Sequence, residues 1–194
     1  MKVKIKGNSK MKYAQIRKFD VTNGPKVRTT LFVSGCTHNC PECFNKDQQS
    51  FQYGELWTEE VEEQFLSYVK NPNVHGVSIL GGEPMQQLMD DSLLKLLTRI
   101  KEETNKEIWL WSGYTYDEII SNPRRKEILE QVDVLIDGPF KAEMKNLSLK
   151  YRGSENQRVI DVKKSLQENK VVLINAIPIL MPFFYQFLAI ETFR

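Results

Sequence analysis

Three cysteines, Cys36, Cys40 and Cys43, fall within eight residues and are the only cysteines of the 194-residue chain. An odd number of thiols in so short a stretch is not a disulfide framework. Their spacing, C-x3-C-x2-C, in a polar loop indicates a site for a metal ion or an iron–sulfur cluster. A four-iron cluster commonly takes four thiolates, so here one iron would lack a protein thiolate and would be free to bind a substrate.

A zinc site is the alternative for this loop. His38 lies between Cys36 and Cys40, so a structural site of three cysteines and one histidine is conceivable. Zinc sites usually pair their ligands as C-x2-C, and Cys36-x-His38 is a poor match to that spacing. The loop alone therefore favours a cluster with His38 close to it rather than bound to it, and leaves zinc open. Three buried structural thiols are disfavoured because the loop is polar.

The composition is that of an ordinary soluble globular protein. The chain has 27 Lys and Arg against 25 Asp and Glu, a net charge of +2, and 41% hydrophobic residues. These values argue against a disordered chain and provide no basic patch for nucleic acid. The length suits one domain but is short of the roughly 250 residues that a closed eight-fold α/β barrel usually needs.

The two ends of the chain differ from the middle. Residues 1–10 are basic and polar and carry no secretory signal, so we expect a short arm, or a leader before an alternative start at Met11. Residues 11–175 read as one domain. Val171 to Ile190 has no charged residue and approaches the length of a membrane span, but two prolines interrupt it. We expect a last core strand, then an apolar tail over residues 176–194, and no membrane association.

Strand-like and helix-like segments alternate along the chain. Strands are expected at Lys26 to Val33, Val74 to Leu80, Ile108 to Trp111, Val132 to Ile136, Val159 to Val162 and Val171 to Ile174. Helices are expected after a Thr58 cap, around Leu93 to Ile100, at Asp117 to Ile120 and at Arg124 to Gln131. This alternation predicts a mostly parallel sheet, whose ligand site lies at the carboxyl ends of the strands. The loops expected to meet there follow Val33, Leu80, Trp111 and Ile136.

A second motif, Gly81-Gly82-Glu83-Pro84, follows the next predicted strand after the cysteine loop. Together the two motifs resemble the signatures of the radical S-adenosylmethionine superfamily. Further blocks are similar, in order and spacing, to those of the anaerobic ribonucleoside-triphosphate reductase-activating family. They are LFVSGC at 31–36, WLWSGY at 109–114, VLIDGPF at 134–140 and RGSENQR at 152–158. The resemblance covers about Met11 to Leu173.

The resemblance implies a fold and an activity. The fold is an incomplete TIM-like β/α barrel with mostly parallel strands, the cluster loop after the first strand, and an open side for a peptide loop of a large partner. The activity is that of a cytoplasmic radical S-adenosylmethionine oxidoreductase with one [4Fe-4S] cluster and an external low-potential electron donor. A 5′-deoxyadenosyl radical would take hydrogen from a glycine of the anaerobic reductase and leave a glycyl radical. An activase of another glycyl-radical enzyme, or a non-catalytic zinc-binding module, is the alternative.

The resemblance also assigns roles to residues. Iron would be held by Cys36, Cys40 and Cys43. S-adenosylmethionine would be contacted by Glu42, Phe44, Gly81, Gly82 and Glu83. The glycines would let the backbone approach the cofactor, with turn geometry as the alternative, and Glu83 would accept a hydrogen bond from the ammonium group. The superfamily often has an aromatic residue where Glu42 stands, and Phe44 follows instead. Candidates for the partner cavity are Trp111, Ser112, Tyr114, Asp137 and Arg152, although loop salt bridges better explain the last two.

Overall fold

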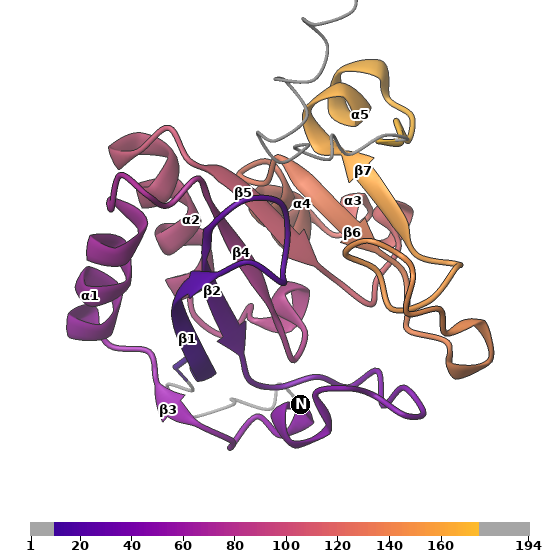
Figure 1. Cartoon of the computed structure of the whole chain (residues 1–194), viewed down its shortest axis with the longest axis horizontal. Coiled ribbons are helices and arrows are strands. Elements are labelled where there is room, and N and C mark those ends of the chain that lie inside the picture. Colours follow the sequence, from indigo (N-terminus) through magenta and orange to yellow (C-terminus); the bar gives the residue numbers. More distant parts are fainter. Residues whose placement is uncertain (1–9, 175–194) are drawn as a thin grey trace, which may run out of the picture.

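A seven-stranded sheet runs through residues 10–174, the part of the chain that this computed structural model describes, in the order β3-β1-β2-β4-β5-β6-β7 (Figure 1). The strands are β1 (Lys12–Asp20), β2 (Arg28–Val33), β3 (Glu55–Leu56), β4 (Gly76–Gly81), β5 (Glu107–Trp111), β6 (Val134–Asp137) and β7 (Arg158–Asp161). Four adjacent strands run parallel to one another: β2, β4, β5 and β6. The edge strands β3 and β7 do not pair with each other, so the described sheet is open.

The α/β class is confirmed, but the sheet is less parallel than expected. β1 pairs antiparallel with β2 and β3, and β7 pairs antiparallel with β6. The cysteine loop follows the second strand, not the first, because β1 precedes it. The sequence of β1, KYAQIRKFD, carries no clear strand pattern because it is rich in polar side chains, which a strand near the sheet edge tolerates. A TIM-like partial barrel is not confirmed beyond this open mixed sheet.

The helices follow local signals that the sequence carries. They are α1 (Glu59–Val69), α2 (Ser92–Glu103), α3 (Tyr116–Ile120), α4 (Pro123–Leu129) and α5 (Val162–Glu168). Thr58 caps α1 as expected, because its side chain accepts a hydrogen bond from the Val61 N–H. Pro123 begins α4, a position where its missing N–H costs nothing. Within residues 10–174, no helix is both long and apolar enough to cross a membrane.

The end of the described chain differs from expectation. α5 begins at Val162, where the sequence suggested only the end of a strand. The expected strand at Val171 to Ile174 forms a single bridge, between Leu173 and Ile160 of β7. Residues 1–9 of the expected arm and the expected tail at 176–194 lie outside the described residues.

The two faces of the sheet have different partners because side chains alternate along a strand. Leu31 and Val33 of β2 and Leu110 of β5 belong to the main core with the apolar sides of the helices. Trp109 of β5 and Ile136 of β6 point to the other face, where a second, smaller cluster forms. We call this second side the inner face.

A buried arginine fastens a turn to the inner face. Arg28 is 1% exposed, and its Nε donates a hydrogen bond to the Ser78 Oγ at 2.8 Å. Its Nη2 donates to the carbonyl oxygens of Val77 and Glu107 at 2.7 and 3.0 Å. The Ser78 hydroxyl in turn donates to the carbonyl of Asn23, in the turn between β1 and β2. Arg28 therefore holds that turn in place.

Replacing Arg28 by Ala should lower the free energy of unfolding by about 2–4 kcal/mol, because it leaves buried acceptors without a donor. Urea denaturation of the metal-free protein measures the loss. Arg124→Ala is the matched control, since Arg124 pairs with Asp91 at an exposed site and its loss should cost less than about 0.5 kcal/mol. Equal losses in the two variants would contradict the role given to Arg28.

Candidate functional site

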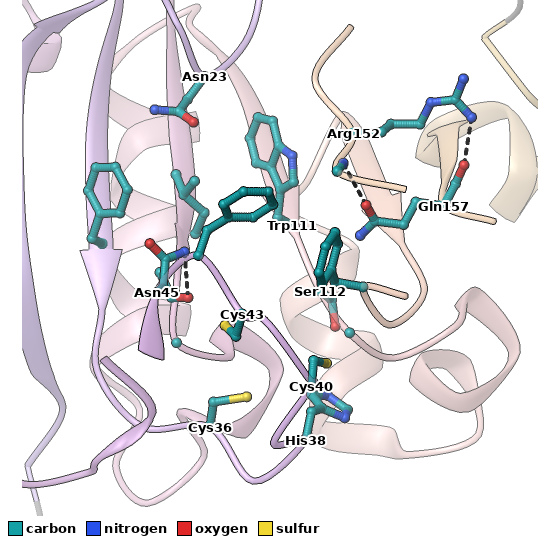
Figure 2. A pocket seen from close by; sticks show the side chains of 18 of the residues that line it. Asn23, Cys36, His38, Cys40, Cys43, Asn45, Trp111, Ser112, Arg152 and Gln157 are labelled. Carbon is teal, nitrogen blue, oxygen red and sulfur yellow. Dashed lines mark hydrogen bonds between the residues drawn. The ribbon is translucent and has the colours of Figure 1, made fainter. Parts of the chain in front are cut away.

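A cavity of about 490 Å³ opens on the inner face, at the carboxyl ends of the parallel strands. Figure 2 shows Cys36, Cys40 and Cys43 near one end of it and Asn23 and Trp111 toward the other. Nine of the predicted site residues line this cavity: Cys36, Cys40, Cys43, Phe44, Gly81, Gly82, Trp111, Ser112 and Arg152. The prediction that loops after the parallel strands meet at one edge is therefore confirmed.

Four predicted site residues lie outside the cavity lining: Glu83, which is described below, and Glu42, Tyr114 and Asp137. The Glu42 side chain is exposed and lies 3.9 Å from the Lys145 ammonium group. The Tyr114 ring packs 4.5 Å from the His38 ring, behind the cavity wall. Asp137 is buried and paired with Arg158, which is the loop salt bridge that the sequence favoured for it.

Several cavity residues were not singled out from the sequence. Polar side chains on the lining to which the motifs assigned no role include Arg17, Asn23, Asn45 and Gln157. Gln157 lies in the RGSENQR block and accepts a hydrogen bond from the Gly153 N–H at 2.8 Å, while its carbonyl accepts one from Arg152 at 2.7 Å. Asn45 donates to the Gly81 carbonyl at 3.2 Å and so ties the cysteine loop to β4.

Burial changes the acidity of two of the thiols. It raises the pKa of Cys36 to about 11 and also raises the pKa of Cys40. Backbone N–H groups of His38 and Phe140 act in the opposite direction, toward the thiolate form. In the metal-free protein these two thiols are therefore protonated at neutral pH, and binding of a metal must release their protons.

The three thiols suit a cluster better than a single ion. Among the described residues, no three His, Cys, Asp or Glu side chains are grouped to hold one metal ion. A structural zinc site needs four such ligands around one point. A cluster is larger, and its thiolates bind different irons, which suits three thiols around one cavity.

The Glu83 carboxylate is buried at the back of the site and joins three loops. Its Oε1 accepts hydrogen bonds from the Met85 N–H at 2.9 Å and the Ser112 hydroxyl at 2.8 Å. Its Oε2 accepts from the Gly113 N–H at 2.7 Å and lies 3.0 Å from the His38 Nε2. A carboxylate has about four acceptor positions, so the chain's own groups use all of them. Glu83 does not line the cavity.

The two glycines of the motif are required by close packing of backbones. Gly81 has a φ of +109°, and a Cβ there would lie 2.6 Å from the Val33 carbonyl oxygen. A Cβ on Gly82 would lie 2.6 Å from the Gly35 carbonyl oxygen, just before Cys36. The Gly82 N–H donates to the Val33 carbonyl at 2.7 Å. The glycines thus bring the ends of β2 and β4 together, whatever else they contact.

Comparisons with known proteins agree with this site. Residues 22–160 match the model of a family described as a 4Fe-4S single cluster domain. The anaerobic ribonucleoside-triphosphate reductase-activating protein of Escherichia coli K12 is 39% identical over 152 residues, 77% of this chain and 97% of that protein. Proteins of the same name from Haemophilus influenzae and bacteriophage T4 are 41% and 35% identical, over 76% and 77% of this chain and 96% and 93% of their own lengths.

Gly81→Ala should destabilise the protein more than Gly138→Ala. Both glycines have positive φ, +109° and +98°, so both variants carry backbone strain of about 1–2 kcal/mol. Only at position 81 does the new Cβ also meet a backbone within 2.6 Å, whereas at position 138 nothing lies closer than 3.7 Å. We expect Gly81→Ala to cost at least about 2 kcal/mol more in urea denaturation. Equal costs would mean that close packing does not explain Gly81.

Proposed function

The chain belongs to the family of anaerobic ribonucleoside-triphosphate reductase-activating proteins, and we propose that it activates such a reductase through reductive cleavage of S-adenosylmethionine. The observation that carries the proposal is the convergence of three thiols, in a chain without a fourth, on one cavity beside the Gly-Gly-Glu-Pro loop. The family model describes a single 4Fe-4S cluster, and three thiols in one loop would leave one of its four irons without a protein thiolate.

Cys36, Cys40 and Cys43 are the proposed iron ligands, and an iron without a protein thiolate would be available to S-adenosylmethionine. When bound and reduced by an external low-potential donor, such a cluster would supply one electron for cleavage of the sulfonium carbon–sulfur bond, which would give methionine and a 5′-deoxyadenosyl radical. A glycine of the reductase then gives up one hydrogen atom, which yields 5′-deoxyadenosine and a glycyl radical. The protein itself binds and orients S-adenosylmethionine and the glycine of the reductase, while the cofactors carry the radical chemistry.

The cavity walls support this assignment. Phe44 is 62% exposed and packs 5.1 Å from the Phe140 ring, so it offers an aromatic face at the cavity rim for the adenine, next to the Glu42 backbone. Gly81 and Gly82 keep the wall beside the thiols free of side chains. The Glu83 carboxylate, which was predicted to accept a hydrogen bond from the ammonium group, has its acceptor positions filled by the chain's own groups. It therefore supports the proposal through the three loops that it joins beside the cavity.

The open sheet supports access by a protein substrate. The cavity lies on the inner face, where the described part of the chain has no helix layer, and Trp111 and Arg152 line it beyond the thiols. A peptide loop of the reductase could enter there, as the implied partial barrel requires. Three free thiols and an oxygen-sensitive cluster favour a reducing compartment, for which we propose the cytoplasm.

Replacing Cys40 by Ala should abolish both the cluster and cleavage of S-adenosylmethionine, because two thiolates cannot hold the cluster. The protein is reconstituted anaerobically with iron and sulfide, and bound iron, absorbance and methionine release after reduction are measured. Ser50→Ala, an exposed site after the same loop, is the control and should behave as wild type. A colourless wild type holding one zinc ion, or an active Cys40→Ala variant, would contradict the proposal.

Incubation of the reduced, loaded protein with S-adenosylmethionine and its cognate anaerobic ribonucleoside-triphosphate reductase should produce a glycyl radical signal in electron paramagnetic resonance. The Cys40→Ala protein should produce none. Cleavage of S-adenosylmethionine without any signal on that reductase would leave the radical chemistry standing but would point to a different glycyl-radical enzyme as partner.

A further inference from the structure

A histidine of the cysteine loop has no role in the function proposed so far. We propose that His38 is a positioning residue: it holds the segment between Cys36 and Cys40 at a set distance from the Glu83 carboxylate, and it is not an iron ligand. The inference deepens the proposed function and rests on it, because the purpose of the contact is to align the two loops that share the cofactor. It explains why an imidazole stands between two iron-binding thiols.

The first observation is the contact itself. His38 Nε2 lies 3.0 Å from Glu83 Oε2, and the other three partners of that carboxylate are hydrogen-bond donors. Because a carboxylate oxygen accepts hydrogen bonds, this contact requires a proton on the His38 Nε2, and the imidazole is the fourth donor to Glu83. Among the described residues, His38 is the only side chain of the 36–43 loop that reaches Glu83. The other donors belong to Met85, Ser112 and Gly113, which follow β4 and β5.

The second observation is that the ring has little freedom to turn. The centroid of the His38 ring lies 4.5 Å from the centroid of the Tyr114 ring. The guanidinium carbon of Arg125 lies 3.7 Å from the same Tyr114 centroid. A Cβ on Gly113 would lie 2.6 Å from the His38 Cδ2, so a glycine is needed beside the imidazole. The His38 side chain is 20% exposed, whereas that of Glu83 is 1% exposed. The imidazole thus lies between the cavity and the buried carboxylate.

The third observation is a second attachment at the neighbouring residue. The Thr37 N–H donates to the Gln86 Oε1 at 2.9 Å, and the Gln86 Nε2 donates back to the Thr37 hydroxyl at 2.8 Å. Gln86 Nε2 also donates to the Tyr114 hydroxyl at 2.9 Å. Thr37 and His38, two consecutive residues between Cys36 and Cys40, are therefore both bound to the loop that carries Glu83. These contacts fix the position of the cysteine loop relative to that loop.

A carboxylate hydrogen bond also orients histidines that bind metals, so the test must separate a positioning residue from a ligand. Three variants of the full chain serve this purpose. His38→Leu removes the donor and keeps an apolar side chain of similar bulk. His38→Gln places an amide nitrogen where Nε2 stands and can restore the hydrogen bond. His75→Leu is the matched control, because His75 is the only other histidine and is exposed.

Two readouts do not depend on turnover. In the metal-free proteins, hydrogen–deuterium exchange of the Met85 and Gly113 amides reports whether the Glu83 contacts persist. In the loaded, reduced proteins, electron paramagnetic resonance reports the cluster before S-adenosylmethionine is added, and titration of the spectral change gives the apparent Kd for the cofactor. Bound iron is measured in each preparation.

We expect His38→Leu to retain wild-type iron content and the wild-type spectrum without cofactor, to exchange the Gly113 amide faster, and to bind S-adenosylmethionine about tenfold more weakly, a change of about 1.4 kcal/mol. His38→Gln should recover most of that affinity, and His75→Leu should match wild type in every readout. A His38→Leu protein that loses iron or shows an altered cofactor-free spectrum would make His38 a ligand and overturn the inference.

Two other results would also overturn it. Wild-type affinity in His38→Leu would show that the contact does not serve the cofactor, and equal weakness in His38→Gln and His38→Leu would show that the hydrogen bond is not what matters. A loaded wild type whose spectrum does not respond to S-adenosylmethionine would refute the proposed function, and this inference with it. If the Gly113 amide of His38→Leu still exchanged faster in that case, the His38–Glu83 contact would be real and only the proposed function would have failed.

Discussion

The hydrogen bonds of one buried carboxylate hold this site together. Glu83 is 1% exposed, and a carboxylate removed from water is costly unless its acceptor positions are filled. Its four partners come from the cysteine loop, from its own loop and from the loop after β5. Satisfying this single group therefore forces three segments, distant in sequence, to meet at one point. The same requirement that stabilises the fold also shapes the wall of the cavity.

The alternation of side chains along the strands makes room for that cavity. Leu31, Val33 and Leu110 pack under the helices, and their neighbours on the same strands are left for the inner face. There Phe32, Leu80 and Trp111 line the cavity. Arg28 is also buried on this face, and its guanidinium is bonded to β4 and β5. The inner face is thus built from alternate residues of strands whose other residues form the main core.

The thiols connect this architecture to the proposed chemistry. Their loop follows β2 directly, and the loop's backbone is bonded to the turn that succeeds it, through the Gly35 and Cys36 N–H groups. These two hydrogen bonds fix the start of the cysteine loop at the end of β2. A raised pKa on Cys36 and Cys40 keeps these thiols protonated until iron replaces the proton.

The sequence by itself determined much of the local structure and indicated the chemistry. Spacing identified the three cysteines and Gly81-Gly82-Glu83-Pro84, and helical periodicity with a Thr58 cap identified α1, because such signals lie within a few neighbouring residues. Only the tertiary structure decided what the polar groups bind. It placed β1 before the cysteine loop, turned Glu83 and Tyr114 away from the cavity, and brought Asn23 and Gln157 to its wall. These outcomes depend on which loops meet across the sheet, and a pattern of neighbouring residues carries no record of such long-range contacts.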